Sequence, residues 1–205
     1  MDIRGLLLCG GSATRFGGSK LLAAIPGDES SGPLAARAAR SLREGAGNAL
    51  AIVPLGAREL RAALEGAGCE VLESDRTARG MGASLAAGVA ATDRADGWIV
   101  ALGDMPLVAP ATIRAVRDAL REGALVAAPV LAATGVRGHP VGFAAALRAE
   151  LLALDADVGA RAIVERHRDA VHLIRTDDAG IAVDLDTREQ LEALRPHYHD
   201  ARKRR

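Results

Sequence analysis

Two kinds of hydrophobic pattern alternate along the chain. Short, continuous apolar runs predict buried strands, and segments in which apolar residues recur every three or four positions predict amphipathic helices. The predicted strands span residues 3–9, 49–55, 69–72, 97–103 and 124–131. The predicted helices span residues 34–44 and 58–67, and another helix begins at Pro110.

This order of elements predicts an α/β fold, a three-layer sandwich in which a mostly parallel sheet carries helices on both faces. The predicted strands are continuously apolar, which is typical of parallel strands covered by helices on both sides. Such sheets bind ligands at the carboxyl ends of their strands. The sequence contains no internal repeat and no linker, so we expect residues 1–205 to form a single domain with a short basic tail at 201–205.

The composition is that of an ordinary soluble globular protein, and it narrows the class of partner. Hydrophobic residues make up 49% of the 205 residues and charged residues 25%. The 26 basic and 26 acidic side chains balance to zero formal charge, so nothing favours a nucleic acid or a membrane surface. The sequence shows no signal peptide and no membrane span, so we expect a cytoplasmic protein in which Cys9 and Cys69 are buried, reduced thiols.

The most informative segment follows the first predicted strand. Its glycines let backbone N–H groups converge, and its two cations add positive charge at the same point, which suits a polyphosphate. The spacing fits neither the Walker A loop nor the dinucleotide fingerprint Gly-x-Gly-x-x-Gly. The alternative is a tight turn with solvated cations. The residues that would bind the phosphates are Leu8, Cys9, Gly10, Gly11, Ser12, Arg15 and Lys20.

A second candidate site follows the predicted strand at residues 97–103. Asp104 comes directly after this strand, and the proline two residues later holds the loop rigid. Carboxylates in such a position hold Mg²⁺ against substrate phosphates, because Mg²⁺ usually takes one or two protein carboxylates and keeps several waters. The alternative is that Asp104 caps the next helix, although Pro110 begins that helix too far along the chain for a direct cap.

These two segments carry a resemblance to a known family. The pattern Leu-x-Gly-Gly-x-x-x-Arg-x-Gly-x-x-Lys and the segment Leu-Gly-Asp-Met-Pro resemble the nucleotidyltransferases that act on molybdenum cofactor, within the larger sugar-nucleotide transferase fold. The resemblance implies a Rossmann-like nucleotidyltransferase fold. It also implies that Arg15 and Lys20 stabilise phosphate charge during catalysis, and that Asp104 is the principal Mg²⁺ ligand.

Residues 183–187, Val-Asp-Leu-Asp-Thr, match a segment with which the family closes its site from the far side. One of the carboxylates of Asp184 and Asp186 would complete the metal site. If this segment is a strand, alternation points both carboxylates to the same side. Asp186 or Thr187 could instead cap the helix that begins near Arg188, and spacing does not choose between the two carboxylates as metal ligands.

The nucleoside of the substrate would be bound by a glycine-rich segment that follows Asp75. Residues 80–85, Gly-Met-Gly-Ala-Ser-Leu, lie at a loop-to-helix junction and resemble a segment of the cytidylyltransferase branch of the family. Its glycines would let the backbone reach the base, and Ser84 could bond to the base or the ribose. The resemblance thus implies nucleotide-binding roles for Asp75, Gly82 and Ser84.

Two further segments resemble the acceptor side of the same branch. Residues 138–141, Gly-His-Pro-Val, correspond to a segment on the pterin side, and residues 157–161 correspond to Asp-x-Gly-Ala-Arg. A single histidine is usually structural, and only this context makes His139 a candidate. The resemblance implies that His139, Asp157 and Arg161 bind the acceptor substrate.

The segments disagree about the base. Gly10 is typical of the guanylyltransferases, whereas the segments around Gly82, His139 and Arg161 are typical of the cytidylyltransferases. Because three segments outweigh one small residue, we expect transfer of CMP from CTP to a molybdopterin-type cofactor, with Mg²⁺ bound and pyrophosphate released.

Three alternatives to this function stay open. They are a GTP-dependent guanylyltransferase acting on the same cofactor, a non-catalytic carrier that matures a molybdenum hydroxylase, and an NAD(P)-dependent oxidoreductase. The absence of Gly-x-Gly-x-x-Gly counts against the oxidoreductase, and the presence of Arg15, Lys20 and Asp104 counts against the carrier. A molybdenum hydroxylase could also be the partner that receives the product.

Overall fold

The computed structural model describes residues 1–10, 20–28, 32–157 and 159–194, so the basic tail lies outside it. The chain has an α/β fold built on a seven-stranded sheet in the order β3-β2-β1-β4-β6-β5-β7. The strand pairs are parallel except where β6 joins β4 and β5. The strands are β1 (Ile3–Leu8), β2 (Leu50–Val53), β3 (Glu70–Glu73), β4 (Gly97–Leu102), β5 (Val126–Leu131), β6 (Val141–Ala144) and β7 (Val171–Thr176).

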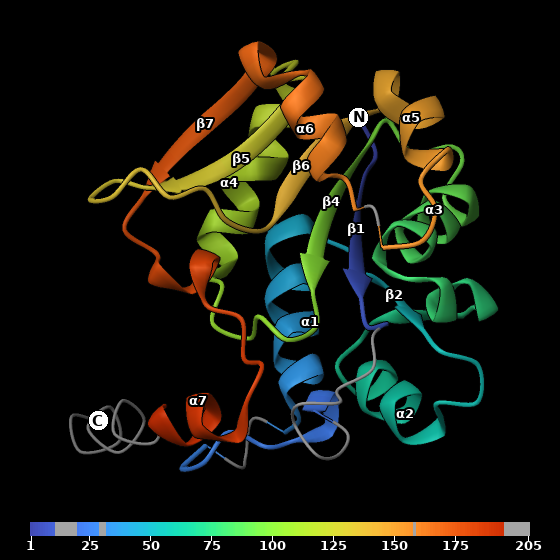
Figure 1. The fold of residues 1–205 in the computed structure, drawn as a ribbon, viewed down its shortest axis with the longest axis vertical. Helices are drawn as coiled ribbons and strands as arrows, with labels where there is room; N and C mark the ends of the chain where they lie inside the picture. The colour runs from blue at the N-terminus through green and yellow to red at the C-terminus, as the bar shows by residue number, and fades with distance from the viewer. Residues whose placement is uncertain (11–19, 29–31, 158, 195–205) are drawn as a thin grey trace.

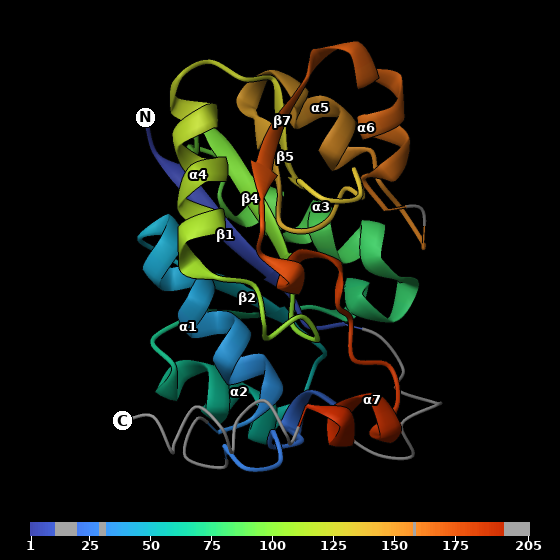
Figure 2. The same cartoon turned by 90° about the vertical axis from the view of Figure 1, so that its left-hand side faces the viewer.

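Helices cover both faces of the sheet, as Figure 2 shows from the side. One face carries α1 (Leu34–Ala46), α2 (Arg58–Gly66) and α4 (Pro110–Arg121), and the other carries α3 (Met81–Ala91), α5 (Arg148–Leu152) and α6 (Arg161–Arg166). The last helix, α7 (Arg188–Ala193), lies apart from these layers, below the sheet in Figure 1. None of the helices within the described residues has the length and apolar character that crossing a membrane requires.

The strands divide their side chains between two cores. In β1, Leu7 packs on the side of α1 and α4, whereas Leu6 and Leu8 pack on the side of α3. Successive side chains of a strand point to opposite faces, so a strand between two helical layers must be apolar throughout. This confirms the physical basis on which a mostly parallel sheet was predicted. Cys9 and Cys69 are both buried and unpaired, as expected.

The ends of β1 and β4 position the candidate site. These strands are parallel neighbours with Leu8 opposite Leu102, so Gly10 and Asp104 leave the sheet side by side. Figure 1 shows both arrows pointing toward the half of the molecule that contains α7. The expected ligand edge of the sheet therefore gathers the segments singled out in the sequence.

Two parts of the fold differ from the sequence prediction. The strands β6 and β7 were not predicted, because each carries too few buried apolar residues to stand out. The strand expected around Asp184 and Asp186 is wrong, since residues 183–186 have no regular secondary structure. The chain there is held by side-chain and backbone contacts to other loops, described below.

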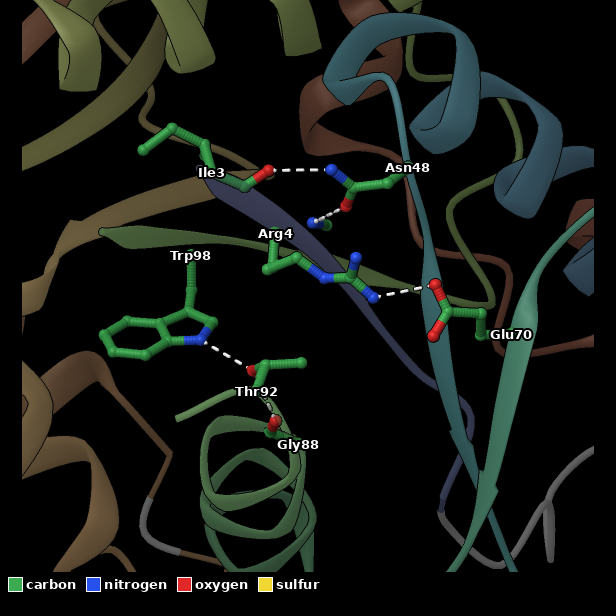
Figure 3. Close-up of polar contacts among 8 residues, drawn as sticks. Ile3, Arg4, Asn48, Glu70, Gly88, Thr92 and Trp98 are labelled. Atoms are coloured by element: carbon green, nitrogen blue, oxygen red, sulfur yellow. Dashed lines mark hydrogen bonds and ion pairs between the residues drawn. The ribbon is translucent and has the colours of Figure 1, made fainter. Parts of the chain in front are cut away.

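The amino end of β1, opposite the candidate site, is fixed by polar side chains (Figure 3). The Asn48 amide donates to the carbonyl oxygen of Ile3 at 2.9 Å and accepts from the N–H of Gly5 at 2.8 Å. The guanidinium of Arg4 donates to Glu70 of β3 at 2.8 Å. These contacts fix β1 at the end that lies away from Lys20 and Asp104.

Candidate functional site

Lys20 connects two carboxylates at the carboxyl ends of the strands. Its Nζ lies 2.8 Å from Oδ2 of Asp104 and 2.8 Å from Oδ1 of Asp186. Only 12% of the Lys20 side chain is exposed, and this burial acts to lower its pKa. The hydrogen bonds and charges of the two carboxylates outweigh burial and raise the pKa of Lys20, so the ammonium group keeps its charge at neutral pH.

The segment of Asp186 is placed by the start of α7. Thr187 caps this helix with Gln190 in a reciprocal capping box, and the Gln190 Oε1 also accepts from the N–H of Asp186 at 2.7 Å. Thr187 is thus the cap, and the carboxylate of Asp186 is directed to Lys20. The charges of Asp184 and of Asp104 both act on His139, so Asp184 also lies at this end of the sheet. The structure brings Asp186 to Asp104 through their shared contact with Lys20.

The pair of Asp104 and Asp186 has the chemistry that a divalent cation requires. Both present a carboxylate oxygen to the same cationic atom, the Nζ of Lys20. Within the described residues, no group of three or more histidine, cysteine or acidic side chains gathers at one point. Mg²⁺ needs no such group, because it binds through one or two carboxylates and completes its shell with water and substrate phosphates. The residues present therefore fit a hard divalent cation.

Gly10 faces the first turn of α3. A methyl group added at Gly10 would lie 3.1 Å from Oγ of Ser84 and 3.3 Å from Cβ of Thr77. Ser84 is buried and donates to the carbonyl oxygen of Gly80 at 2.9 Å. The predicted base-binding serine thus lies against the predicted phosphate loop. Thr77, also buried, was not singled out in the sequence because no pattern marks a contact between these two loops.

The turn before α3 meets the segment that contains Asp157. Gly80 has a φ of 122°, and a methyl group there would lie 2.3 Å from Oδ1 of Asp157. The N–H of Gly82 donates to the carbonyl oxygen of Ala156 at 2.9 Å. Two segments predicted separately, one for the base and one for the acceptor, are therefore in direct contact. Asp75 lies near them, exposed at the start of the short helix η3 (Asp75–Arg79).

A mostly apolar pocket of about 240 Å³ lies between α3, α6 and the sheet, and it contains two of the predicted acceptor-binding residues, His139 and Arg161. Leu8 from the end of β1 lines it as well, and an Arg137–Glu165 ion pair with a 2.7 Å contact lies in its wall. Burial lowers the pKa of His139, which favours the neutral ring at neutral pH. The pocket thus offers an apolar surface with charges at its wall.

Part of the predicted phosphate loop cannot be compared with this geometry. Gly11, Ser12 and Arg15 lie outside the described residues, whereas Leu8, Cys9, Gly10 and Lys20 lie within them. Cys9 is buried beside Gly103, and burial, more than the nearby Cys69 and Asp104, raises the pKa of its thiol well above the ordinary value. A protonated, buried thiol is a packing group, so Cys9 contributes to the loop through its backbone.

The fold is that of a nucleotidyltransferase, an enzyme that uses a nucleoside triphosphate. The chain belongs to the MobA-like NTP transferase domain family, whose profile matches residues 5–171. This match covers β1 to the start of β7 and includes Lys20 and Asp104. A search of curated proteins gives no significant match.

Solved structures show the same fold. The crystal structure of Rv0371c from Mycobacterium tuberculosis H37Rv is 27% identical in sequence, with 95% of this chain and 97% of that chain covered and a TM-score of 0.80. The manganese complex of Rv0371c is 25% identical, with 96% and 99% covered and a TM-score of 0.76. A nucleotidyl transferase from Methanothermobacter, 21% identical with 98% and 99% covered and a TM-score of 0.76, shares the fold.

Proposed function

We propose that the protein transfers CMP from CTP to the terminal phosphate of a molybdopterin-type cofactor and releases pyrophosphate. The observation that carries this proposal is the convergence of Lys20, Asp104 and Asp186 at the carboxyl ends of β1 and β4. This is the edge at which open parallel sheets bind their ligands. A buried cation beside two carboxylates suits a triphosphate bound with a divalent metal.

The reaction needs no protein nucleophile, because positioning and neutralisation of charge are sufficient for an in-line displacement. In the proposal Asp104 and Asp186 would hold Mg²⁺, which would supply positive charge that neutralises the phosphates. Lys20 stabilises the negative charge of the leaving pyrophosphate. Arg15 and the backbone of Gly11 and Ser12, outside the described residues, are proposed to bind the remaining phosphate oxygens.

The assignment of CTP depends on the resemblance of residues 80–85 to the cytidylyltransferase branch. The contact between Gly10 and Ser84 supports a base site at this point, because it brings the first turn of α3 to the end of β1. Gly82 and Asp75 are proposed to border the same site. GTP stays the second candidate, because Gly10 is the residue typical of the guanylyl branch.

The acceptor is proposed to bind in the pocket that contains His139 and Arg161. An apolar cavity suits a flat ring system, and the guanidinium of Arg161 at its wall suits a phosphate or an oxygen-rich group. Asp157 is proposed to support the turn at Gly80, which it contacts directly, so that the base and acceptor sites share a wall. A manganese complex of the relative Rv0371c supports a divalent metal in this family.

The experiment that tests this proposal is a thermal-shift panel of the four nucleoside triphosphates with Mg²⁺ and of NAD(P)H, followed by an assay of pyrophosphate release with the cofactor. A specific ligand raises the melting temperature by mass action. We expect CTP to give the largest shift and to support turnover. Turnover with GTP alone would assign the guanylyl reaction, binding of the cofactor without pyrophosphate release would assign a carrier, and a shift with NAD(P)H alone would assign an oxidoreductase.

A further inference from the structure

Asp178 joins two distant parts of the chain through a single carboxylate. Its Oδ2 accepts from the backbone N–H of Ala109 at 2.9 Å and from the hydroxyl of Thr112 at 2.7 Å. Its Oδ1 accepts from the N–H of Gly180 at 3.0 Å, at the start of the short helix η6 (Ala179–Ala182). Asp178 thus caps α4 from 69 residues away along the chain and fixes η6 to the start of that helix.

Beyond Asp178, residues 179–185 form a second segment, which stays attached to the first segment, the loop between β4 and α4. Gly180 packs so closely on this loop that an added methyl group would lie 2.3 Å from the carbonyl oxygen of Leu107. Further along, the N–H of Leu185 donates to the backbone carbonyl of Asp104 at 3.2 Å. The two segments therefore run alongside each other, with Asp178 at one end of the contact and Asp104 at the other.

The attached segments each carry one of the carboxylates that meet at Lys20. Asp104 begins the first segment, and Asp186 follows directly after Leu185 in the second. The second segment has no regular secondary structure at residues 183–186, so no helix or strand ladder fixes its path there. The contacts with the loop between β4 and α4 act here together with the capping box of α7, the packing of Leu185 in a small core and the bond from the His139 N–H to the Ile181 carbonyl.

We propose that Asp178 is a positioning residue, which sets the separation of the Asp104 and Asp186 carboxylates and thereby their joint affinity for a divalent cation. The inference rests on the proposed function only through this metal pair. A carboxylate suits the role because its two oxygens accept from three donors on both segments. An asparagine of the same size has a single acceptor oxygen, and its amide N–H would face a donor on one of the two segments.

The test measures binding of Mn²⁺ alone, without nucleotide, by electron paramagnetic resonance. Groups that hold metal ligands in place typically affect metal affinity strongly when they are changed, so Asp178→Asn should weaken Mn²⁺ binding by about tenfold or more. Thr112→Val removes one of the three hydrogen bonds and should give a smaller loss. Asp177→Asn, an exposed neighbour with the same change of charge, is the matched control and should leave the affinity unchanged.

The measurement is made well below the melting temperature of every variant, so that a capping role is separated from a positioning role. A cap that only stabilises α4 would lower the melting temperature and leave the dissociation constant for Mn²⁺ unchanged, and this result in both Asp178→Asn and Thr112→Val would overturn the proposal. A wild-type protein that binds no Mn²⁺ would overturn it as well. If wild type fails to use CTP but Asp178→Asn still weakens Mn²⁺ binding, the substrate assignment fails and the positioning role stands.

Discussion

Lys20 holds its ammonium group between two carboxylates, so one positive charge faces two negative charges at the ligand edge of the sheet. The excess of one negative charge attracts a second cation. A triphosphate brings negative charge of its own, and its phosphates compete with the carboxylates for the Lys20 ammonium. The three residues therefore have the properties expected of groups that exchange partners when nucleotide and metal bind together.

The role of Asp104 is tested by its replacement with asparagine, which keeps the shape of the side chain and removes the charge. We expect turnover to be lost, because an amide binds Mg²⁺ far more weakly than a carboxylate. Asp93→Asn, at an exposed position away from the site, is the control for loss of one negative charge. Normal activity in a folded Asp104→Asn protein would exclude Asp104 as a metal ligand.

Lys20→Ala should weaken the binding of CTP more than that of CMP. Charge-assisted hydrogen bonds contribute about 1.5–3 kcal/mol, so a loss of about tenfold or more is expected for the triphosphate. Isothermal titration with each nucleotide in the presence of Mg²⁺ gives the two dissociation constants, and Arg94→Ala, at an exposed position, controls for the lost charge. If the binding of CTP and the binding of CMP weaken equally, Lys20 lies away from the β and γ phosphates.

Gly10→Ala tests the choice of base. The new methyl group would lie 3.1 Å from Oγ of Ser84, so Ser84 must move by a small amount and the space beside the base narrows. A purine needs more of this space than a pyrimidine, and a methyl-sized difference is worth about 1–3 kcal/mol. We expect kcat/KM for GTP to fall by about tenfold or more while that for CTP falls less.

A second variant shows whether this effect passes through Ser84. In a Ser84→Ala background the close contact with Oγ is gone, so Gly10→Ala should change the preference for the base by less than it does in wild type. If the wild-type protein prefers GTP and Gly10→Ala destroys that activity, the phosphate loop decides the base, and the cytidylyl assignment is wrong.

At the scale of elements, β1 organises the site because its carboxyl end lies beside that of β4. The Asn48 side chain holds the amino end through Ile3 and Gly5 (Figure 3), and the carboxyl end leads into Gly10. Asn48→Ala leaves a donor and an acceptor of β1 without this partner, which should lower the free energy of unfolding by about 1–3 kcal/mol. Urea unfolding measures the loss.

The position of Asn48 also predicts which property stays unchanged. Because it lies at the end of β1 away from Lys20 and Asp104, Asn48→Ala should retain kcat and KM at temperatures where the protein is folded. Asn48→Asp keeps the acceptor for the Gly5 N–H and loses the donor to Ile3, so its stability should lie between those of wild type and Asn48→Ala. A large fall in kcat would show that the two ends of the strand are coupled.

The sequence predicts those elements whose hydrophobic pattern is strong. The strand β4 and the helix α4 begin at the predicted residues. Trp98 to Val100 form a continuous buried run, and Pro110 marks the first helical position. The strand β6 contains Gly142 and only four residues, and β7 contains no buried residue, so neither pattern was visible. Element boundaries and strands with few buried side chains depend on tertiary pairing that a local pattern does not contain.

The residues of the candidate site also differ in how far the sequence alone predicts them. Gly10 and Asp104 follow strong strands, and the rule for ligand edges of parallel sheets places them together. Asp186 required the resemblance to a family, and its contact with Lys20 depends on a path of the chain that the sequence pattern does not contain. Asp178 could not be predicted, because Ala109 and Thr112, its two partners on the other segment, are more than sixty residues away and no sequence spacing records them.

At the scale of the whole molecule, the buried histidine of the pocket links stability to pH. In the unfolded chain His139 has an ordinary pKa near 6.5, whereas burial lowers the pKa in the folded protein. The carbonyl oxygen of Val100 and the charges of Asp104 and Asp184 oppose this effect without reversing it. The unfolded state therefore takes up a proton more readily than the folded state as the pH falls below about 6.5.

The sign of the effect follows from this difference. A lowered folded pKa contributes stability that is present above pH 6.5 and is lost as the pH falls through the folded value, so the free energy of unfolding should decrease between pH 7 and pH 5. The carboxyl groups of Glu73 and Glu150 have lowered pKa values, so their contribution to stability is lost only as the pH falls below 4.5, their ordinary pKa. Urea unfolding between pH 5 and pH 7 therefore reports mainly on histidines.

His139→Gln should flatten this part of the pH profile, because glutamine can still donate to the Val100 carbonyl but does not titrate. His172→Gln, which changes an exposed histidine on β7, is the matched control and should leave the profile as in wild type. If His139→Gln retains the full slope, protonation of the pocket histidine does not limit stability in acid. A flattened slope would instead show that the neutral form of His139 stabilises the folded protein.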